Sequence, residues 1–380
     1  AGSRGKQPLV TFRQINSPLS SAESKEGYTL IVSEKGVEIS AGEFSGFFNA
    51  LQTVRQLIRK DNKKYSMPYC RIKDAPAFPV RGLMLDVGRN YMSVPFLKSV
   101  VRRLSHYKIN VLHLHLSDDP GWRVEVKKYP ELTVETSFWP TRQPGKFYTQ
   151  EDIKSICDFC DSLNIRVIPE IDMPGHSAAF RKAIGKDMQT PEGMQVLKEA
   201  LDEIIPLFKD SLFHIGSDEV HFKMKEFMPE MIRYVRSKGK QVVVWYPGYA
   251  PDSNAVRMCW GEYEAGYSLD KSAPYIDCNG FYMDWMDSQG GVLQTFFQYP
   301  CEVPQARGKA LGSEMCVWTD GVISSDERIL LQYPFYPTML TFSERIWRGS
   351  REKRRDLVAN LPAKGTKAWE AFNEFEDRLI

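Results

Sequence analysis

Residues 81–89 read Arg-Gly-Leu-Met-Leu-Asp-Val-Gly-Arg, and residues 108–119 read Lys-Ile-Asn-Val-Leu-His-Leu-His-Leu-Ser-Asp-Asp. Each stretch contains a short apolar run, at 82–86 and 110–116, and is closed by acidic residues, which is typical of a buried strand. Between them, residues 95–107 carry apolar side chains at helical spacing. A strand, a helix and a strand in succession predict parallel strands joined by a right-handed crossover.

The same alternation continues along most of the chain. Further strand-like runs lie at 166–171, 212–215, 241–245, 256–260, 275–278 and 311–318, and further helical patterns at 150–163, 192–208 and 225–237. Eight such strands predict an α/β fold in which a (β/α)8 TIM barrel is closed. The connections after the fifth and sixth strands are short for full helices, so we expect that part of the barrel to be irregular.

Two further units are expected beside the barrel. Residues 1–79 predict a small α/β domain, because four strand-like runs surround a helical pattern at 45–59 and the Pro-rich stretch 74–79 makes a natural boundary. The catalytic barrel is expected to occupy 80–350. Residues 351–380 are expected to form a C-terminal helical extension that packs on the barrel rather than a charged partner site.

The composition excludes several classes of protein. The 380 residues include 50 Lys and Arg against 48 Asp and Glu, and 42% are hydrophobic, which is ordinary for a globular protein. The formal net charge is +2 and no basic stripe is interleaved with aromatics, so nucleic-acid binding is not expected. No run approaches 18 apolar residues, so no membrane span is expected. The oligomeric state stays open.

Acidic residues follow most of the predicted strands where each strand ends. They are Asp86, Asp118 and Asp119, Glu170 and Asp172, Asp218 and Glu219, and, near the last two strands, Asp284 and Asp320; Arg89 and His176 lie among them. A single acid at such a place is commonly a helix cap or a loop hydrogen bond. Six strands with this feature predict a functional mouth, because the carboxyl ends of barrel strands meet on one face.

Clustered carboxylates suit either a metal site or glycoside hydrolysis. His113 and His115 can share one face of a strand, but the sequence has 6 His and no His-Glu-x-x-His motif, so no metal is expected. No cofactor is expected either, because no dinucleotide fingerprint and no P-loop is present. Five tryptophans near strand ends favour a sugar pocket, since aromatic rings suit the apolar faces of a pyranose; they are Trp122, Trp245, Trp260, Trp285 and Trp318.

The adjacent pair Asp218 and Glu219 points to one version of sugar chemistry. Retaining enzymes with an enzymic nucleophile place two carboxyls ~5–5.5 Å apart on opposite sides of the anomeric carbon, which successive residues do not suit. A neighbouring pair instead suits substrate-assisted hydrolysis. Glu219 would protonate the leaving oxygen, while Asp218 would hold a 2-acetamido group that attacks the anomeric carbon.

At these residues the chain resembles glycoside hydrolase family 20, the β-N-acetylhexosaminidases. The resemblance covers about residues 25–350 and rests on motifs in the family's order, at 27–30, 46–53, 81–89, 108–119, 168–176, 214–220 and 343–347. It implies exo-hydrolysis of terminal β-linked GlcNAc or GalNAc, with net retention through an oxazolinium intermediate. Such substrates are extracytoplasmic glycans, so the resemblance also implies a secreted or periplasmic protein.

The resemblance implies a role for each matching residue. Glu219 matches the general acid/base, Asp218 the residue that orients the acetamido group, and Tyr282 the donor to the acetamido oxygen. Other matches are supporting or substrate-binding: Trp245, Trp260 and Trp318 as aromatic walls, Arg89 and Asp284 for distal hydroxyls, and Asp118 with His176 as a dyad beside the acid.

Three positions depart from the family pattern. Trp318-Thr-Asp320 stands where the family usually has Trp-x-Glu, which leaves the preference between GlcNAc and GalNAc open. Ser217 replaces a common Gly with little expected effect, and Trp245-Tyr-Pro lacks the usual acid. The alternatives are a relative that releases a disaccharide or modified sugar, and a catalytically silent glycan-binding protein; the intact Asp218, Glu219 and Tyr282 argue against the latter.

Overall fold

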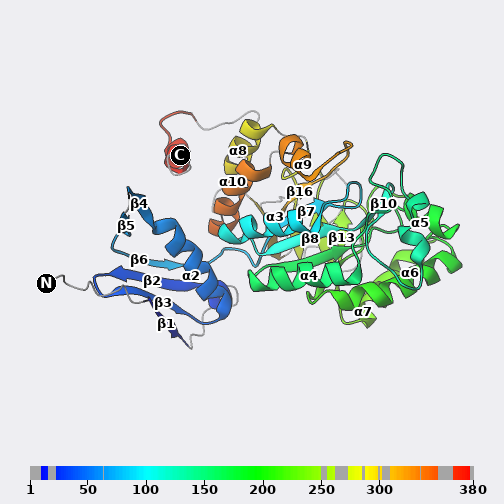
Figure 1. Cartoon of the computed structure of the whole chain (residues 1–380), viewed down its shortest axis with the longest axis horizontal. Coiled ribbons are helices and arrows are strands. Elements are labelled where there is room, and N and C mark those ends of the chain that lie inside the picture. Colours follow the sequence, from blue (N-terminus) through cyan, green and yellow to red (C-terminus); the bar gives the residue numbers. More distant parts are fainter. Residues whose placement is uncertain are drawn as a thin grey trace.

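The computed structural model describes residues 10–15, 23–62, 64–249, 255–261, 273–284, 287–297, 300–301, 309–333, 335–349 and 363–376. Two bodies are visible: a small sheet with one long helix at the N-terminal end, and a larger unit of strands surrounded by helices (Figure 1). Trp285 and residues 351–362, which were singled out above, lie outside the described residues.

The larger unit is a closed barrel of eight parallel strands, as predicted. The strands are β7 (Val80–Asp86), β8 (Val111–His115), β11 (Arg166–Glu170), β12 (Leu212–His214), β13 (Gln241–Tyr246), β14 (Val256–Cys259), β15 (Tyr275–Asp277) and β16 (Ala310–Val317). Neighbours in the barrel follow chain order, and β16 pairs with β7 to close it. The register aligns Asp86 with His115, His115 with Glu170, and Glu170 with His214. Four polar side chains at the carboxyl ends of adjacent strands therefore lie in one layer.

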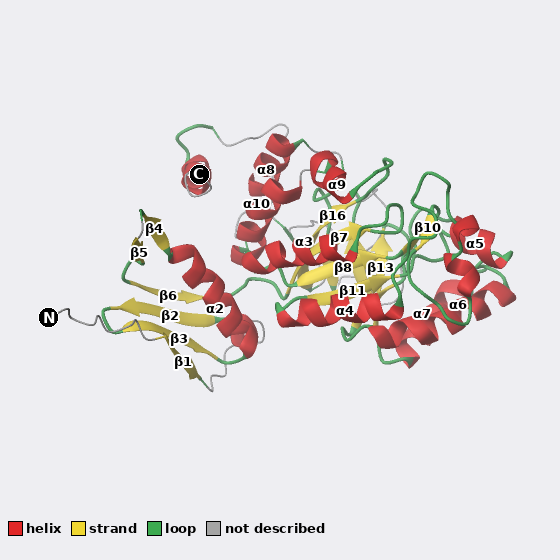
Figure 2. Cartoon of the chain, in the orientation of Figure 1, coloured by secondary structure: helices red, strands yellow, loops and turns green. Residues whose placement is uncertain are grey.

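Helices cover the outside of the barrel (Figure 2). They are α3 (Val94–His106), α4 (Gln150–Ser162), α5 (Ala178–Ile184), α6 (Pro191–Ile204), α7 (Phe227–Ser237), α8 (Ser288–Phe297), α9 (Asp326–Gln332) and α10 (Phe335–Arg348). Capping side chains fix several starts: Ser93 accepts from the Phe96 N–H, and Thr149 forms a capping box with Asp152. No helix occurs among the described residues between β13 and β15.

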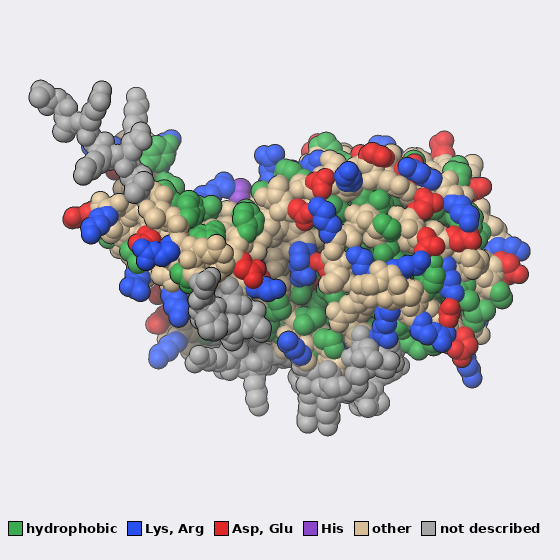
Figure 3. All heavy atoms as spheres, turned by 90° about the horizontal axis from the view of Figure 1, so that it is seen from below, with side chains coloured by type: hydrophobic (Ala, Val, Ile, Leu, Met, Phe, Trp, Pro, Cys, Tyr) green, Lys and Arg blue, Asp and Glu red, His purple; other side chains and the backbone are tan. Residues whose placement is uncertain are grey.

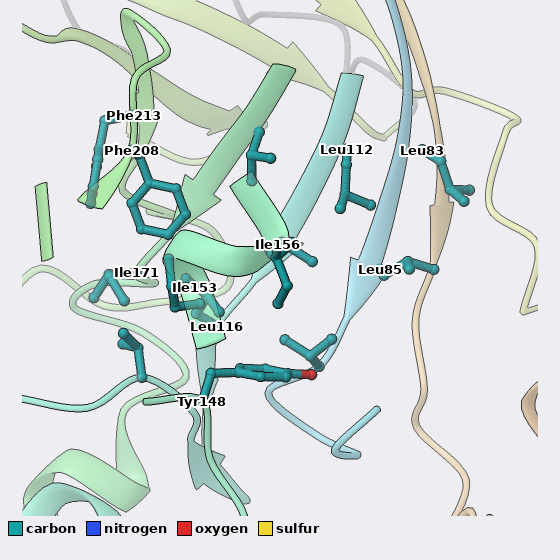
Figure 4. Packing of buried hydrophobic residues seen from close by; sticks show 14 of the residues in the cluster. Leu83, Leu85, Leu112, Leu116, Tyr148, Ile153, Ile156, Ile171, Phe208 and Phe213 are labelled. Carbon is teal, nitrogen blue, oxygen red and sulfur yellow. The ribbon is translucent and has the colours of Figure 1, made fainter. Parts of the chain in front are cut away.

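The alternation within each strand separates an outer core from the barrel interior. On β7 and β8, Leu83, Leu85 and Leu112 point outward and belong to the same buried cluster as Ile153 and Ile156 of α4 (Figure 4). The intervening residues point inward, among them Met84 and Val111, which belong to a separate interior cluster. Because side chains alternate along a strand, His113 and His115 share the inward face.

The small N-terminal unit is a four-stranded sheet in the order β1 (Val10–Gln14), β3 (Gly36–Ala41), β2 (Tyr28–Ser33), β6 (Cys70–Asp74). The helix α2 (Phe44–Leu57) contacts β2 and β3 over a core that includes Leu30 and Ile39. The short helix α1 (Glu23–Glu26) precedes β2, and β4 (Arg59–Asp61) and β5 (Lys64–Ser66) form a hairpin. The unit is joined to the barrel by an ion pair between Arg81 and Glu26 and by a hydrogen bond from Trp347 Nε1 to Asp74 Oδ1 (2.9 Å).

Two further features concern the surface. Helix α11 (Lys367–Glu376) packs against α8, where Phe372 contacts Phe296 and Phe297. Positive and negative side chains are interspersed over the face shown in Figure 3. Among the described residues, every helix is too short or too polar to cross a membrane.

Candidate active site

A pocket opens at the carboxyl ends of the barrel strands. It is lined by Arg89, Asp118, Asp172, His176, Asp218, Glu219, Trp260, Tyr282, Asp284, Trp318 and Asp320. The structure thus brings together ten of the eleven residues assigned to the site from the sequence. It adds Asp172, which follows β11 and was noted only as a strand-end acid.

The eleventh residue, Trp245, lies beneath the pocket rather than on its wall. Its side chain is fully buried, and its Nε1 donates a 2.6 Å hydrogen bond to Glu170 Oε1. Its ring packs against Trp318, with the ring centroids 5.5 Å apart. Among the described residues, Trp245 therefore supports a wall that Trp318 and Trp260 present to the pocket.

Glu219 and His176 form one side of the pocket. The Glu219 side chain is 61% exposed, and its Oε2 lies 3.5 Å from His176 Nε2. His176 Nδ1 lies 3.6 Å from Asp118 Oδ2. Burial lowers the pKa of His176, but the neighbouring acids Asp118 and Asp172 outweigh it and raise that pKa to about 10. His176 is therefore an imidazolium at neutral pH, with a carboxyl group at each ring nitrogen.

Asp218 lies deeper, next to Asp172. Its Oδ1 is buried and has no hydrogen-bond partner. Burial raises the pKa of Asp218 to about 6, and Glu170 adds to that rise while His176 opposes it. Burial and the charge of Asp218 also hold the pKa of Asp172 well above its usual range. The pocket thus contains a carboxyl oxygen that is free to accept a hydrogen bond from a ligand.

An unusual backbone lets two successive side chains face the same pocket. The φ angles of Gly216, Ser217 and Glu219 are +65°, +97° and +47°. In an extended strand, Asp218 and Glu219 would point to opposite faces, whereas this turn brings both to the pocket. A Cβ at Ser217 is strained at this φ, because only glycine adopts such a conformation readily. The Gly-to-Ser departure is therefore not conformationally neutral.

Arg89 is the most extensively paired cation of the pocket lining. Its guanidinium contacts three carboxylates: Nη1 with Asp86 (3.0 Å), Nη2 with Asp118 (3.1 Å) and Nε with Asp320 (3.2 Å). It also lies 5.0 Å from the Trp318 ring centroid. These contacts fix the orientation of the guanidinium before any ligand arrives.

Asp284 and Tyr282 complete the lining. Burial raises the pKa of Asp284 to about 6, and its Oδ1 has no hydrogen-bond partner. Burial also holds the pKa of Tyr282 well above its usual range, so the hydroxyl remains a donor. The Tyr282 ring lies 5.9 Å from that of Trp318.

Sequence reasoning missed a set of buried charged groups directly below the pocket. His115 Nδ1 lies 2.7 Å from Glu170 Oε2, and its Nε2 lies 3.0 Å from Asp118 Oδ2. Burial lowers the pKa of His115, but the charge of Glu170 and the hydrogen bonds with Asp118 and Glu170 outweigh it and hold that pKa well above its usual range. His113 Nδ1 forms a hydrogen bond with Glu314 Oε2 (3.1 Å), whereas its Nε2 lies 3.1 Å from Glu170 Oε2 without making a hydrogen bond. The spacing His113-x-His115 on a strand was the available signal, but it does not show which acids the rings meet.

Some donor sets in the described part of the chain are close enough to share a metal ion. In the pocket they come from Asp172, His176 and Asp218, and inside the barrel from His113, Glu170 and His214, with donor atoms within 4.8 Å of one another. In the interior set, His214 Nδ1 lies 3.1 Å from Glu170 Oε1 and accepts a hydrogen bond from the Gly216 N–H (3.0 Å). The ligand types suit a transition metal, and within the described residues His113 Nε2 and His214 Nε2 have no hydrogen-bond partner.

The comparisons with known proteins agree on one family. Residues 78–226 match the family model for the glycosyl hydrolase family 20 catalytic domain, and residues 5–75 match that for family 20 domain 2. The β-hexosaminidase of Akkermansia muciniphila is 32% identical over 91% of this chain and 81% of its own length. That of Vibrio furnissii is 30% identical over 81% of this chain.

Solved structures give the same result. The Flavobacterium johnsoniae chitobiase superposes with a TM-score of 0.76 at 27% identity, covering 93% of this chain and 59% of that one. The Vibrio harveyi exo β-N-acetylglucosaminidase, solved with N-acetylglucosamine, gives 0.76 at 25% identity, covering 97% and 68%. The chain spans 63%, 53% and 54% of the β-hexosaminidases of V. furnissii, Porphyromonas gingivalis and Cellulomonas fimi. With its barrel, its preceding domain and this level of identity, the chain belongs to glycoside hydrolase family 20.

Proposed function

We propose that this protein is a β-N-acetylhexosaminidase that removes terminal β-linked GlcNAc or GalNAc from glycans, with retention and with the substrate's acetamido group as nucleophile. The observation that carries the proposal is the turn at 216–219. It places Glu219 and the unpartnered Oδ1 of Asp218 in one pocket. A separate enzymic nucleophile across from Glu219 is then unnecessary.

In the first step, the Asp218 carboxylate accepts the acetamido N–H at Oδ1, and the Tyr282 hydroxyl donates to the acetamido oxygen. That oxygen attacks the anomeric carbon as Glu219 gives its proton to the glycosidic oxygen, so the leaving alcohol departs neutral. In the second step, Glu219 takes a proton from a water molecule that attacks the anomeric carbon. The oxazolinium ring opens, and the free sugar and protonated Glu219 are restored.

The remaining residues bind and support. Arg89, Asp284 and Asp320 would hold the distal hydroxyls, while Trp260 and Trp318 would form the aromatic walls and Trp245 would brace Trp318. Asp118 and His176 would act as a supporting pair, because the imidazolium beside Glu219 stabilises its carboxylate after proton transfer. No step requires a cofactor.

We also propose a division of the chain into a small α/β domain at 1–79, the catalytic barrel at 80–350 and a helical extension at 351–380. The separate sheet, the two family matches that meet between residues 75 and 78, and the packing of α11 on α8 support it.

The test is hydrolysis of aryl β-GlcNAc, aryl β-GalNAc and the matching β-glucoside by the wild type and by Glu219→Gln. We expect cleavage of the N-acetyl substrates alone, and a loss of about 10²- to 10⁴-fold in Glu219→Gln for a poor leaving group. Equal cleavage of the glucoside would contradict the acetamido mechanism. No cleavage by a folded protein would favour a larger or modified substrate, or a silent glycan-binding protein.

A further inference from the structure

The segment after β16, residues 318–325, has no regular secondary structure and carries Trp318 and Asp320 into the pocket. Its peptide groups are bonded mainly to side chains from other loops. Thr319 N–H donates to Asp86 Oδ2 (3.0 Å), and Asn90 Nδ2 donates to the carbonyls of Thr319 (2.6 Å) and Gly321 (2.9 Å). The position of Asp320 is therefore set by residues outside its own segment.

Arg142 makes three of these contacts, as many as Asn90 does. Its Nη1 donates to the carbonyls of Thr319 (3.1 Å) and Gly321 (2.8 Å), and its Nη2 donates to the carbonyl of Asp320. Arg142 is 8% exposed and belongs to the long loop between β8 and α4, a distant part of the sequence. One guanidinium thus binds three successive carbonyls, which a single ammonium on a Lys cannot match in geometry.

Arg142 is not part of the pocket lining, whereas Asp320 is. Asp320 Oδ1 lies 3.2 Å from Arg89 Nε, so it reaches the group that faces the ligand. An Asp has a shorter reach than the family's usual Glu, so its contact with Arg89 depends closely on where the backbone holds its Cα. A movement of the 319–321 backbone would break that contact before it disturbed Glu219 or Asp218.

We propose that Arg142 is a positioning residue that sets affinity for the distal part of the sugar, and the preference between GlcNAc and GalNAc, by holding Asp320 against Arg89. This inference rests on the proposed function for the identity of the ligand. It assigns to Arg142 no contact with the substrate. Its effect passes through Asp320, and this dependence makes it testable.

The experiment is a double-mutant cycle between Arg142→Lys and Asp320→Ala. We expect Arg142→Lys to raise KM for aryl β-GlcNAc by about fivefold or more, to change kcat much less, and to shift the GlcNAc-to-GalNAc ratio of kcat/KM. In the Asp320→Ala background the same substitution should have little further effect, because coupled residues are not additive. Calorimetric titration of the same four proteins with N-acetylglucosamine gives the corresponding cycle in binding free energy, without turnover.

Arg81→Lys is the matched control. Arg81 is also a buried arginine, and it donates to the carbonyls of Phe78 and Lys108 at the other end of the barrel. The Arg81→Lys substitution should lower the midpoint of thermal unfolding without changing KM or the GlcNAc-to-GalNAc ratio of kcat/KM. If Arg142→Lys does not fold, Arg142→Gln keeps an amide donor for one carbonyl and replaces it in the cycle.

Two failures are distinguishable. Additive effects in an active enzyme, or a sugar ratio unchanged in Arg142→Lys, would overturn the inference and leave the proposed function standing. A wild type that neither cleaves the aryl substrates nor binds N-acetylglucosamine would overturn both. Binding without cleavage would contradict the enzymatic proposal alone, and the calorimetric cycle would then decide the role of Arg142.

Discussion

The two sides of the pocket hold their charged groups differently. On the side of Arg89, the guanidinium is already paired with Asp86, Asp118 and Asp320 and lies over the Trp318 ring. On the other side, Glu219 is exposed and the buried Oδ1 of Asp218 has no partner. Fixed ion pairs suit a site that recognises hydroxyls in the same way throughout the reaction. Unpaired and titratable groups suit a site where protons and charge move.

Asp118 joins the two sides. Its Oδ2 lies near Arg89 on one side, near His176 on the side of Glu219, and near the buried His115. Burial opposes ionisation of Asp118, but the hydrogen bond from His115, the nearby His176 ring and the charge of Arg89 hold its pKa well below the usual range. The Asp118 carboxylate therefore contacts both the Arg89 guanidinium and the His176 ring that lies beside Glu219.

The largest effect on turnover is expected at Asp218. Asp218→Ala should lower kcat by about 10²- to 10³-fold, because the acetamido group loses the acceptor that orients it as its charge develops. Azide should restore little activity, since the internal nucleophile is still present but badly placed. Steady-state kinetics with and without azide measure this. Strong rescue would point instead to an ordinary enzymic nucleophile and remove the distinction drawn between the two sides.

A different pattern is expected at Arg89. Arg89→Ala should raise KM by about 10- to 100-fold and also lower kcat, because a group that grips the ring throughout is lost. Arg89→Lys is the matched control, since it keeps the charge but not the three-way geometry. Kinetics on aryl β-GlcNAc measure both constants. Wild-type values in Arg89→Ala would place the guanidinium outside the binding site.

The pH dependence of stability tests whether His176 is charged between Asp118 and Glu219. Since the pKa of His176 is raised to about 10 in the folded protein, its stabilising contribution should be complete below pH ~6.5 and lost as the pH rises toward 10. Wild type and His176→Gln should therefore differ most in unfolding free energy at low pH and converge on the alkaline side. Denaturant titrations across this range measure the difference, with the exposed His221→Gln as control. A difference that grows with pH would contradict the charged state assigned to His176.

The smallest effect concerns the strained turn. Ser217→Gly should raise the unfolding free energy by up to about 1 kcal/mol, because glycine relieves the positive φ at that position. Ser217→Ala keeps the Cβ and should give no such gain. Chemical denaturation of the three proteins measures this. Equal stability of the Gly and Ala variants would show that the turn stores no strain at Ser217.

Much of this protein was predictable from the sequence by itself. The period of the apolar residues indicates eight strands that alternate with helices, a pattern that predicts a parallel sheet, and eight such units are typical of a closed barrel. The acids placed after those strands, above all Asp218 and Glu219, then had to meet at one mouth. The adjacent pair Asp218 and Glu219 also suggested substrate-assisted hydrolysis, which stays a prediction.

Only the tertiary structure decided which strand-end residues contact each other across different strands and loops. Trp245 and Trp260 both lie at strand ends in the sequence. In the barrel, Trp260 lines the pocket, whereas Trp245 is fully buried and packs against the ring of Trp318. From the sequence, His115 was expected only to share an inward face with His113. The alignment of His115 with Glu170 on the neighbouring strand makes it part of the buried charged group below the pocket. Arg142 carried no signal, because its partners lie 177 to 179 residues away. Local pattern specifies elements and their faces, whereas contacts between loops depend on how the closed barrel aligns its strands.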